Sequence, residues 1–457
     1  MKKIVIALVC LLLVGAVAFW YFKRDSDKAR DVLPANATTV MVFEPVELVE
    51  ELGLSLKDIF QLLSFWGDAE NSIDFAKPCY LFNTESGMTG FALNVSDKVN
   101  IEKTLTSLGF ASDEQRGYTW LTNSSSICCL DDDKMMVCSA SATEQDAVRN
   151  EIYALMSQKR QDVPVLDKAN GQKGVLRGST ALCNLPKQLA LPIPPGTDLS
   201  EVFLSVALRI EKKAISLSAK LDGVDNLSIP LLPIKGDLIS IEPEEPFAWV
   251  CVNMKGEELL PYLRKMPEIR TALLGLNLSV DADLMIKAID GDVAVAIPKV
   301  DEHPEFIITA KLKDTDFLAN SADWKVNARS KTDFSVTQNE MNVFFGVRDE
   351  KLYIASSEQL ADKACRKAEA EDYQEEAKGK YLSASLDLED LIQAVMKRPS
   401  TMSMTLMLPQ VRSFVNALER LSLTADSPQS LELRIETDEP VKELYANLFS
   451  LFTGDKK

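Results

Sequence analysis

An internal repetition most limits what this chain can fold into. Residues 31–235 and residues 236–457 each begin with a short apolar strand and a helix, continue through a strand pair, a short helix and a hairpin, and finish near another strand pair. Self-similarity over such a long period indicates two copies of one structural unit. Each copy has roughly 200 residues, which is enough to bury a core of its own or to share one sheet with its twin.

The opening strand and helix show the repetition. Runs of apolar residues predict strands over Thr38–Phe43 and Phe247–Val252. Apolar residues spaced three and four apart predict amphipathic helices over Val46–Leu63 and Gly256–Leu274. We therefore expect both copies to start with the same strand and helix.

A hairpin gives the best local match between the copies. Leu130–Val137 aligns with Val347–Ile354 at a constant offset of 217, and in both segments apolar strands flank a tight acidic turn. A Ser-x-x-Glu/Gln pattern follows each hairpin, at Ser141–Glu144 and at Ser356–Gln359. In such a box the serine hydroxyl accepts a hydrogen bond from a free amide at the helix start. We expect a helix to begin at each box.

The remaining predicted elements follow the same order in both copies. The other strands are Cys79–Phe82, Gly90–Val95, Gly174–Cys183, Val202–Ile210 and Ala214–Leu221 in the first copy, and Val293–Ile297, Phe306–Leu312, Lys380–Leu386, Leu421–Ala425 and Leu431–Glu436 in the second. The other helices are Val99–Leu108, Leu185–Leu189, Thr315–Ala322, Leu388–Met396 and, in the second copy only, Val441–Phe452. This pattern predicts an α+β fold, a tandem duplicated unit in which amphipathic helices cover mostly antiparallel sheet. Four prolines between Leu227 and Pro246 block helix formation, so we place the boundary at residue 235.

Residues 1–30 are predicted to be a signal anchor. Ile4–Phe22 contains nineteen uncharged residues and ends in four aromatic residues followed by two basic ones. A helix of roughly 20 apolar residues spans a bilayer, and aromatic residues beside basic ones suit the headgroup boundary. An uncleaved transmembrane helix is thus the favoured interpretation. The alternatives are cleavage after the small residues Ala16–Ala18, or lipidation of Cys10, where Val9 departs from the expected small residue.

The charge distribution limits the partners of the body. Six basic and two acidic side chains give residues 1–30 a net charge of +4, so residues 31–457 carry −22 when the whole chain carries −18. Such a surface makes a nucleic-acid backbone a poor partner. A short basic N-terminal tail before a first hydrophobic segment usually stays inside, so we expect the bulk of the chain on the extracytoplasmic side of a cell membrane.

The cysteines do not predict a disulfide framework. The eight cysteines are Cys10, Cys79, Cys128, Cys129, Cys138, Cys183, Cys251 and Cys365. Without Cys10 their number is odd and their spacing irregular, and most lie in apolar strand-like runs. We expect buried free thiols, with Cys128 and Cys129 on opposite faces of one strand.

No catalytic or cofactor motif is present in the sequence. The one histidine, His303, lies in a polar segment that is predicted to be a loop, without a serine elbow or a cysteine signature to partner it. A single histidine excludes His-rich zinc sites, and no phosphate-binding or dinucleotide-binding glycine pattern occurs. We therefore predict no catalytic, cofactor-binding or metal-ligating residue and no cofactor.

Acidic residues are the remaining candidates for a site. Asp281 with Asp283, Asp290 with Asp292, and the triple Asp131–Asp133 lack the spacing of a calcium loop and are predicted to be solvated turns. The run from Glu369 to Glu376 is predicted to be a solvated helix end or loop. A pair of carboxylates that converges only in space, as in glycoside hydrolases, stays open.

The hydrophobic leader, the entry into the first strand at Leu33–Val40 and the duplicated pattern together resemble a known type of protein. The chain is similar to uncharacterised Bacteroidetes envelope families that are described as domains of unknown function. The resemblance covers nearly the whole chain and implies a membrane-anchored or lipoprotein-like envelope protein. Many such proteins are anchored through a lipidated cysteine, and Cys10 lacks the expected context. The resemblance implies no catalytic residue.

These observations lead to one expected function and two alternatives. We expect a non-enzymatic, membrane-tethered envelope protein that binds an unidentified protein or ligand, with the membrane contacted through Ile4–Phe22 and no nucleic-acid partner. One alternative is an acidic-residue hydrolase that acts on envelope glycans or lipids. The other is a carrier of an apolar ligand in a cavity between sheet and helices.

Overall fold

A computed structural model describes most of the chain. The described residues are 27–52, 72–141, 143–185, 197–224, 231–239, 246–277, 279–298, 305–338, 341–366, 370–396 and 409–446. The predicted anchor Ile4–Phe22 and His303 lie outside them. Within the described residues no helix is both long enough and apolar enough to cross a membrane.

The described residues form runs of strands separated by helices. The strands are β1 Ala37–Phe43, β2 Cys79–Thr84, β3 Thr89–Asn94, β4 Ala111–Gln115, β5 Tyr118–Thr122, β6 Ser126–Leu130, β7 Lys134–Ser139, β8 Leu176–Ala181, β9 Phe203–Glu211, β10 Ala214–Asp222, β11 Leu231–Leu232, β12 Ala248–Lys255, β13 Ile289–Ile297, β14 Ile307–Leu312, β15 Asn327–Ala328, β16 Asp333–Gln338, β17 Met341–Arg348, β18 Lys351–Ala355, β19 Leu382–Asp387, β20 Leu418–Ala425 and β21 Ser430–Thr437. The helices are α2 Lys28–Asp31, α3 Pro45–Leu52, α5 Lys98–Ser107, α6 Gln145–Ser157, α7 Pro164–Asn170, α8 Gly256–Leu263, α9 Pro267–Leu276, α10 Ala282–Lys287, α11 Glu358–Lys363, α12 Asp372–Glu375, α13 Leu388–Met396 and α14 Pro409–Asn416, with 3₁₀ turns η2 Leu182–Asn184 and η3 Asp316–Asp323. Residues 441–446 are also helical.

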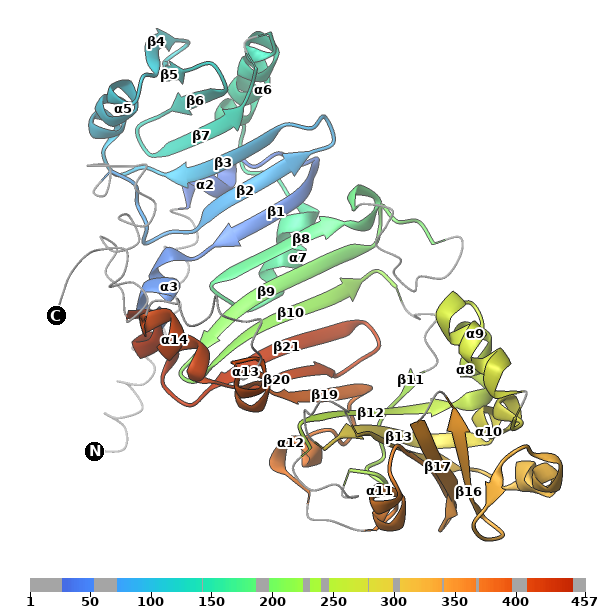
Figure 1. Cartoon of the computed structure of the whole chain (residues 1–457). Helices are drawn as coiled ribbons and strands as arrows, with labels where there is room; N and C mark the ends of the chain where they lie inside the picture. Colours follow the sequence, from blue (N-terminus) through green and yellow to red (C-terminus); the bar gives the residue numbers. More distant parts are fainter. Residues whose placement is uncertain are drawn as a thin grey trace, which may run out of the picture.

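All these strands belong to one antiparallel sheet (Figure 1). In the first half the neighbours run β4, β5, β6, β7, β3, β2, β1, β8, β9, β10. In the second half they run β15, β16, β17, β18, β14, β13, β12, β19, β20, β21, and the short β11 adds to β12. The prediction of an α+β fold with mostly antiparallel sheet is confirmed, and the strand order of the two halves is the same.

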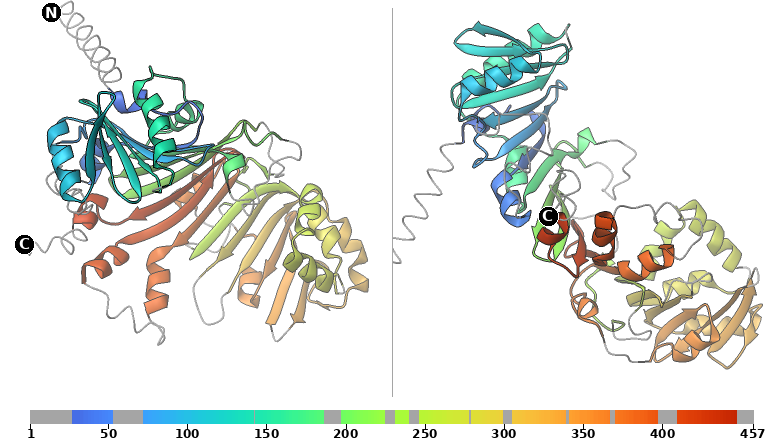
Figure 2. Two further views of the ribbon diagram at one scale, coloured as in Figure 1. Left: turned by 90° about the horizontal axis from the view of Figure 1, so that it is seen from above. Right: turned by 60° about the vertical axis from the view of Figure 1, so that its left-hand side comes forward.

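The two halves share the sheet through β10 and β21. These strands pair antiparallel from Ala214 opposite Glu436 to Lys220 opposite Ser430, with Leu217 opposite Leu433. Figure 2 shows the continuous curved sheet, with the halves on either side of this pair. Of the two arrangements that the sequence left open, the structure has the shared sheet.

Helices cover both faces of the sheet. Successive side chains of a strand point to opposite faces, so each face carries apolar residues that a helix can bury. In the first half, Cys129 lies in the core under α2, α6 and α7, whereas Cys128 lies in the core under α5. The prediction for this vicinal pair is confirmed. In the second half, α11 closes the core around Trp249 and Cys251, and α8, α9 and α10 close the core around Leu312 on the other face.

Four local predictions differ from the structure. The helix expected to begin at the Ser141–Glu144 box begins only at Gln145, with Glu144 as its N-cap, because the Ser141 hydroxyl donates to the Glu144 carboxylate and, among the described residues, accepts from no helix amide. The helix expected over Gly256–Leu274 is two helices, α8 and α9, because a turn precedes Pro267, which starts α9. The segment Thr315–Ala322 forms the 3₁₀ turn η3 in place of an α-helix. The cap of α11 is Ser357, one residue later than predicted, because the Ser356 hydroxyl bonds the backbone of Phe306.

The beginning of the described chain is fixed in the first core. The Asp27 carboxylate accepts hydrogen bonds from the Asn94 amide, at 2.9 Å, and from the Tyr80 hydroxyl. The Asn94 side-chain oxygen accepts from the backbone N–H groups of Lys28, at 2.8 Å, and Ala29, at 3.1 Å. Asp27, Asn94 and Tyr80 are all buried. Residue 27 is therefore already fixed in the first core.

The proline-containing segment before β12 packs on the second half. Ile234, Leu238 and Ile239 are buried with Trp249. The fully buried Asp292 accepts backbone hydrogen bonds from residues 235, 236 and 237, at 2.9, 2.7 and 2.7 Å. Asp292 is thus a structural residue, and the prediction that it lies in a solvated turn is wrong, since its carboxylate replaces water as the acceptor for three amides.

Candidate functional site

The central strands have one polar and one apolar face. Ser383, Ser385, Ser422 and Thr424 alternate with leucines and an alanine along β19 and β20, so their hydroxyls share one face. Cross-strand pairing sets Ser383 opposite Thr424 and Ser385 opposite Ser422. The result is a row of hydroxyl groups next to the β10–β21 pair.

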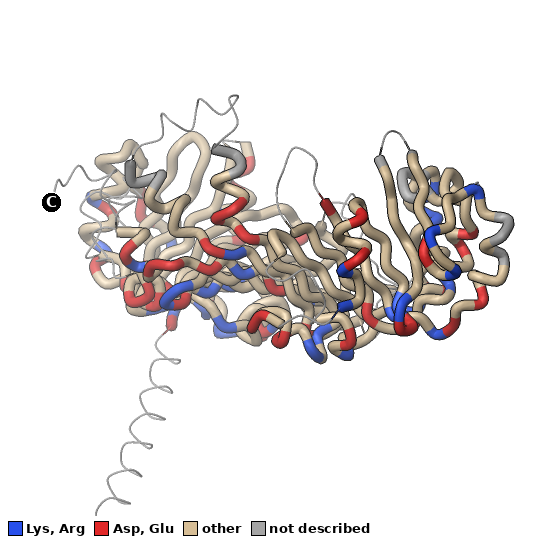
Figure 3. The backbone as a smooth tube through the Cα atoms, turned by 60° about the horizontal axis from the view of Figure 1, so that its bottom comes forward, with Lys and Arg blue, Asp and Glu red and all other residues tan. Residues whose placement is uncertain are grey.

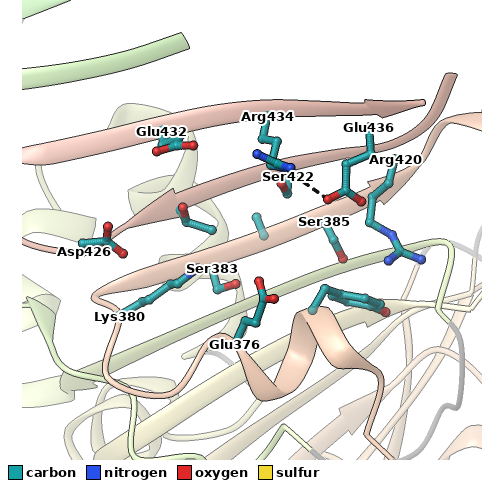
Figure 4. A pocket seen from close by; sticks show the side chains of 13 residues that line it. Glu376, Lys380, Ser383, Ser385, Arg420, Ser422, Asp426, Glu432, Arg434 and Glu436 are labelled. Atoms are coloured by element: carbon teal, nitrogen blue, oxygen red, sulfur yellow. Dashed lines mark hydrogen bonds and ion pairs between the residues drawn. The ribbon is translucent and has the colours of Figure 1, made fainter. Parts of the chain in front are cut away.

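A pocket of about 270 Å³ lies on this polar face, beside α12 (Figure 4). Its lining comes from α12 and the residues after it, and from β19, β20 and β21: Tyr373, Glu376, Lys380, Ser383, Ala384, Ser385, Arg420, Ser422, Thr424, Asp426, Glu432, Arg434 and Glu436. Known small-molecule pockets measure about 300 to 1,000 Å³, so this one suits a small ligand.

Ion pairs hold the side of the pocket that faces the first half. Arg434 of β21 contacts Glu211 of β9 at 2.8 Å and Glu436 at 3.2 Å. Glu432 of β21 contacts Arg209 of β9 at 2.6 Å. Each half therefore gives one arginine and one glutamate to a reciprocal pair of contacts that crosses the junction. These charges belong to the sheet and have their partners within it.

Arg420 is held differently. Its guanidinium lies 4.2 Å from the centre of the Tyr373 ring, a cation–π arrangement. Its cross-strand neighbours are Asp387 and Glu436. Asp387 accepts the backbone N–H of Asp390 at 2.8 Å, and Glu436 contacts Arg434. Among the described residues Arg420 forms no ion pair, and its side chain lines the pocket.

Tyr373 is positioned by its surroundings. Its ring meets Trp249 edge-on, with centroids 6.0 Å apart and planes at 74°. Burial raises the pKa of the Tyr373 phenol, against the opposing effect of a hydrogen bond with Ser385. The phenol therefore stays neutral and the ring gives Arg420 a fixed platform. Figure 4 shows Arg420 and Asp426 at opposite ends of the pocket, with Glu376 between them.

The acidic residues that the sequence singled out lie elsewhere. Asp281 caps α10, Asp283 pairs with Arg264, and Asp132 pairs with Lys98 at 3.4 Å. In the described part of the chain no group of three or more His, Cys, Asp or Glu side chains is placed to hold a metal ion. The acidic run ends in the short helix α12, where Asp372, Glu375 and Glu376 are exposed, in line with the predicted solvated helix end, whereas Gln374 is buried and closes a capping box.

The cysteines follow the prediction with one exception. All seven described cysteines are free, and six are buried, whereas Cys183 is exposed. Burial raises the pKa of the Cys79, Cys129 and Cys138 thiols to about 12. These thiols are protonated at neutral pH and act as small apolar side chains.

Sequence reasoning assigned no function to Tyr373 or Arg420. They are far apart in the chain and meet only because β19 pairs with β20. The sequences of β20 and β21 did contain an indication of the site. In both strands charged and hydroxyl side chains alternate with apolar ones, so one face of these paired strands is polar. A paired central strand with such a polar face indicates a surface that needs polar partners.

Charged residues of both signs occur along the whole described chain (Figure 3). The chain matches none of the curated protein sequences with which it was compared. Among solved structures, crystal forms IV and I of TP0453 are each 16% identical with a TM-score of 0.29, covering 41% and 43% of this chain and 78% and 79% of theirs. A DNA polymerase sliding clamp from Pseudomonas aeruginosa is 9% identical with a TM-score of 0.11, covering 88% of this chain and 99% of its own.

One family profile matches most of the chain. The profile described as Domain of unknown function (DUF4836) matches residues 60–439, which contain every residue of the pocket. The chain belongs to the DUF4836 family of domains of unknown function.

Proposed function

We propose that the protein is a non-enzymatic, membrane-tethered binding protein of the cell envelope, and that the pocket beside α12 takes a small polar ligand. The observation that carries this proposal is Arg420, held on Tyr373 over a floor of serine and threonine hydroxyls without a carboxylate partner. Fixed donors around a small concavity are typical of ligand recognition. The polar lining favours a polar ligand over an apolar one.

The tether is part of the proposal. Ile4–Phe22 has the length and the aromatic and basic flank of a membrane anchor. The body begins at Asp27, which is fixed to Asn94 and Tyr80 in the first core. Five residue steps from Phe22 span at most about 18 Å. In this proposal the first half stays close to the extracytoplasmic face of the bilayer. We also propose that the protein belongs to a Bacteroidetes cell envelope and is anchored there by its N-terminal helix or by a lipid.

We also propose that residues 31–235 and 236–457 are two copies of one unit. The identical strand order of the halves and the match of the β6–β7 hairpin to the β17–β18 hairpin support this. The reciprocal contacts Arg209 to Glu432 and Arg434 to Glu211 fit an origin in which two units joined through the same edge strand.

A second candidate function has one observation in its favour. The pocket gathers four carboxylates, Glu376, Asp426, Glu432 and Glu436. Two converging carboxylates are what a glycan hydrolase needs. Glu432 and Glu436 are already engaged by Arg209 and Arg434, which favours a structural role for that pair.

A binding experiment tests the proposal. The full chain in lipid nanodiscs is screened by thermal shift and calorimetry against small polar metabolites, beside Arg420→Gln and the control Lys220→Gln, which changes a cation on β10 outside the pocket. We expect at least one metabolite to bind wild type and the control, and to bind Arg420→Gln more weakly. Equal binding to all three proteins would contradict the site, and turnover of an envelope glycan would favour the hydrolase.

Protease shaving tests the tether. Intact cells and spheroplasts are treated with protease, and the mature N-terminus is sequenced. We expect residues 31–457 to be cut only where extracytoplasmic protein is accessible, and the N-terminus to begin at or near Met1. A freely dissolved cytosolic protein would contradict the tether.

A further inference from the structure

We propose that the pocket binds a zwitterion, such as an amino acid or a short peptide, with its carboxylate on Arg420 and its ammonium group toward Glu376. The inference rests on the proposed function, because it names the class of ligand for the same site. It follows from which charges of the pocket have partners and which have none.

The carboxylate position follows from Arg420. A guanidinium presents five N–H donors in a planar fork that matches a carboxylate. The Tyr373 ring occupies one face of the guanidinium at 4.2 Å, and neither cross-strand carboxylate forms an ion pair with it. The edges of the fork are therefore available to a ligand, and stacking limits the conformational entropy that Arg420 loses on binding.

The ammonium position follows from the free carboxylates. Glu432 and Glu436 contact arginines, whereas Glu376 and Asp426 form no ion pair among the described residues. Figure 4 shows Asp426 at the end of the pocket opposite Arg420, beside Lys380, and Glu376 between the two ends. Glu376 is therefore the carboxylate within reach of a small ligand held by Arg420, and a positive group of the ligand would pair with it.

The net charge of the pocket lining favours a zwitterion over an anion. The pocket has three cations, Lys380, Arg420 and Arg434, and four carboxylates, which gives a net charge of −1. A dianion such as phosphate would bring further negative charge into this surrounding, whereas a zwitterion adds none. The hydroxyls of Ser383, Ser385, Ser422 and Thr424 can then bond the amide or backbone atoms of the ligand.

Calorimetry with four probes tests the ligand class. The full chain in nanodiscs is titrated with L-alanyl-L-alanine, acetate, ethylamine and inorganic phosphate at neutral pH. We expect the dipeptide to bind at least tenfold more tightly than the other three. If acetate binds as tightly as the dipeptide, the proposed ammonium contact is wrong. If phosphate binds more tightly than the dipeptide, the ligand is not a zwitterion, although the pocket is still a binding site. Failure of every probe and of the wider metabolite screen would overturn the proposed function itself.

Substitutions assign the contacts. Charge-assisted hydrogen bonds contribute about 1.5–3 kcal/mol, so Arg420→Gln should weaken dipeptide binding by about 10- to 100-fold. Arg420→Lys keeps the charge but not the fork and should recover only part of the affinity. Glu376→Gln should weaken the dipeptide and leave acetate unchanged, which separates the two ends of the ligand.

Tyr373 is a positioning residue, and its variants need a conservative comparison. Tyr373→Phe keeps the ring and should bind the dipeptide within about threefold of wild type, whereas Tyr373→Leu should lose about tenfold. Near-UV circular dichroism and the melting temperature confirm folding of each variant, and Lys220→Gln is the control for a changed surface charge. Equal affinity of Tyr373→Leu and wild type would overturn the role of the stacked arginine.

Discussion

The same place in the sheet is closed in the first half and open in the second. In the first half α7 packs on β8, beside β1 and β9, and buries Val165, Leu166 and Ala169. Arg177 on the strand below is paired with Glu44 at 2.6 Å. In the second half the element before β19 is the four-residue α12, and a pocket remains over the hydroxyls of β19 and β20. One strand order thus supports a filled core in one half and a pocket in the other.

The difference comes from a few residues before one strand. Pro164 starts α7, and apolar residues at helical spacing follow it, so this helix can bury a face against the sheet. The acidic residues around α12 cannot be buried without partners, so this helix contributes Tyr373 and Glu376 to a polar pocket instead. The segment that leads into a strand, and not the strand order, therefore decides where a pocket forms.

Truncating the helix of the closed half should have the largest effect. Leu166 is fully buried, so Leu166→Ala should lower the free energy of unfolding by about 2–5 kcal/mol without changing ligand affinity. The matched change in α12, Gln374→Ala, removes a capping contact and should cost about 1 kcal/mol. Urea unfolding of the two variants measures both effects, and equal losses would remove the contrast between the halves.

The hydrogen bonds of Asp27 lie in the first half, and one substitution removes them. Asp27→Ala leaves the buried Tyr80 hydroxyl and Asn94 amide without their acceptor, which should cost about 2–3 kcal/mol. Hydrogen exchange at Ala29 should rise strongly in this variant, with little change in the second half. Unchanged protection of Ala29 would show that the carboxylate does not fix the segment.

A partly buried carboxyl group, that of Asp333, distinguishes the second half and predicts a pH effect. Burial opposes the charge of Asp333, but bonds from Ser330, at 2.6 Å, Tyr353, at 2.5 Å, and Arg348, at 3.0 Å, lower the pKa of this carboxyl below its usual value. A lowered pKa contributes stability above the unfolded value of about 3.9, and this contribution is lost as the pH falls through the folded value.

Asp333→Asn should therefore destabilise the protein by about 1 kcal/mol at pH 7. The difference from wild type should shrink as the pH falls below about 4. Thermal unfolding between pH 3 and pH 7 measures it. In the aligned hairpin of the first half Met136 takes the place of Tyr353, so no such pH effect is expected from that position. A pH-independent difference would contradict the role of the Asp333 charge.

The contacts across the junction should have the smallest effect. Arg209 and Glu432 are each about one third exposed, so solvent screens their contact. A double-mutant cycle with Arg209→Gln and Glu432→Gln should give a coupling of about 0.5 kcal/mol that falls in high salt. A coupling above about 2 kcal/mol would mean that this pair, and not the β10–β21 pairing, holds the halves together.

Much of the fold could be predicted from the sequence, for identifiable reasons. The strands β1, β9, β10, β20 and β21 and both aligned hairpins follow from apolar alternation and acidic turns. The strand β4 was missed because all five of its residues, from Ala111 to Gln115, are exposed and four of them are polar. The helix α7 was missed because it is short and begins at Pro164.

The pocket could not be predicted in the same way. Tyr373 and Arg420 are brought together by long-range strand pairing, which local periodicity does not specify. Nothing in the sequence distinguishes the free Arg420 from Arg434, whose partner Glu211 lies in the other half. Which charges are paired depends on the sheet register across β10 and β21.

A structure of the protein with L-alanyl-L-alanine tests the account most directly. We expect the dipeptide beside α12, with its carboxylate within about 3.2 Å of the Arg420 guanidinium and its ammonium group facing Glu376. An empty pocket at saturating dipeptide, or a dipeptide bound with its ends reversed or at another part of the molecule, would contradict it.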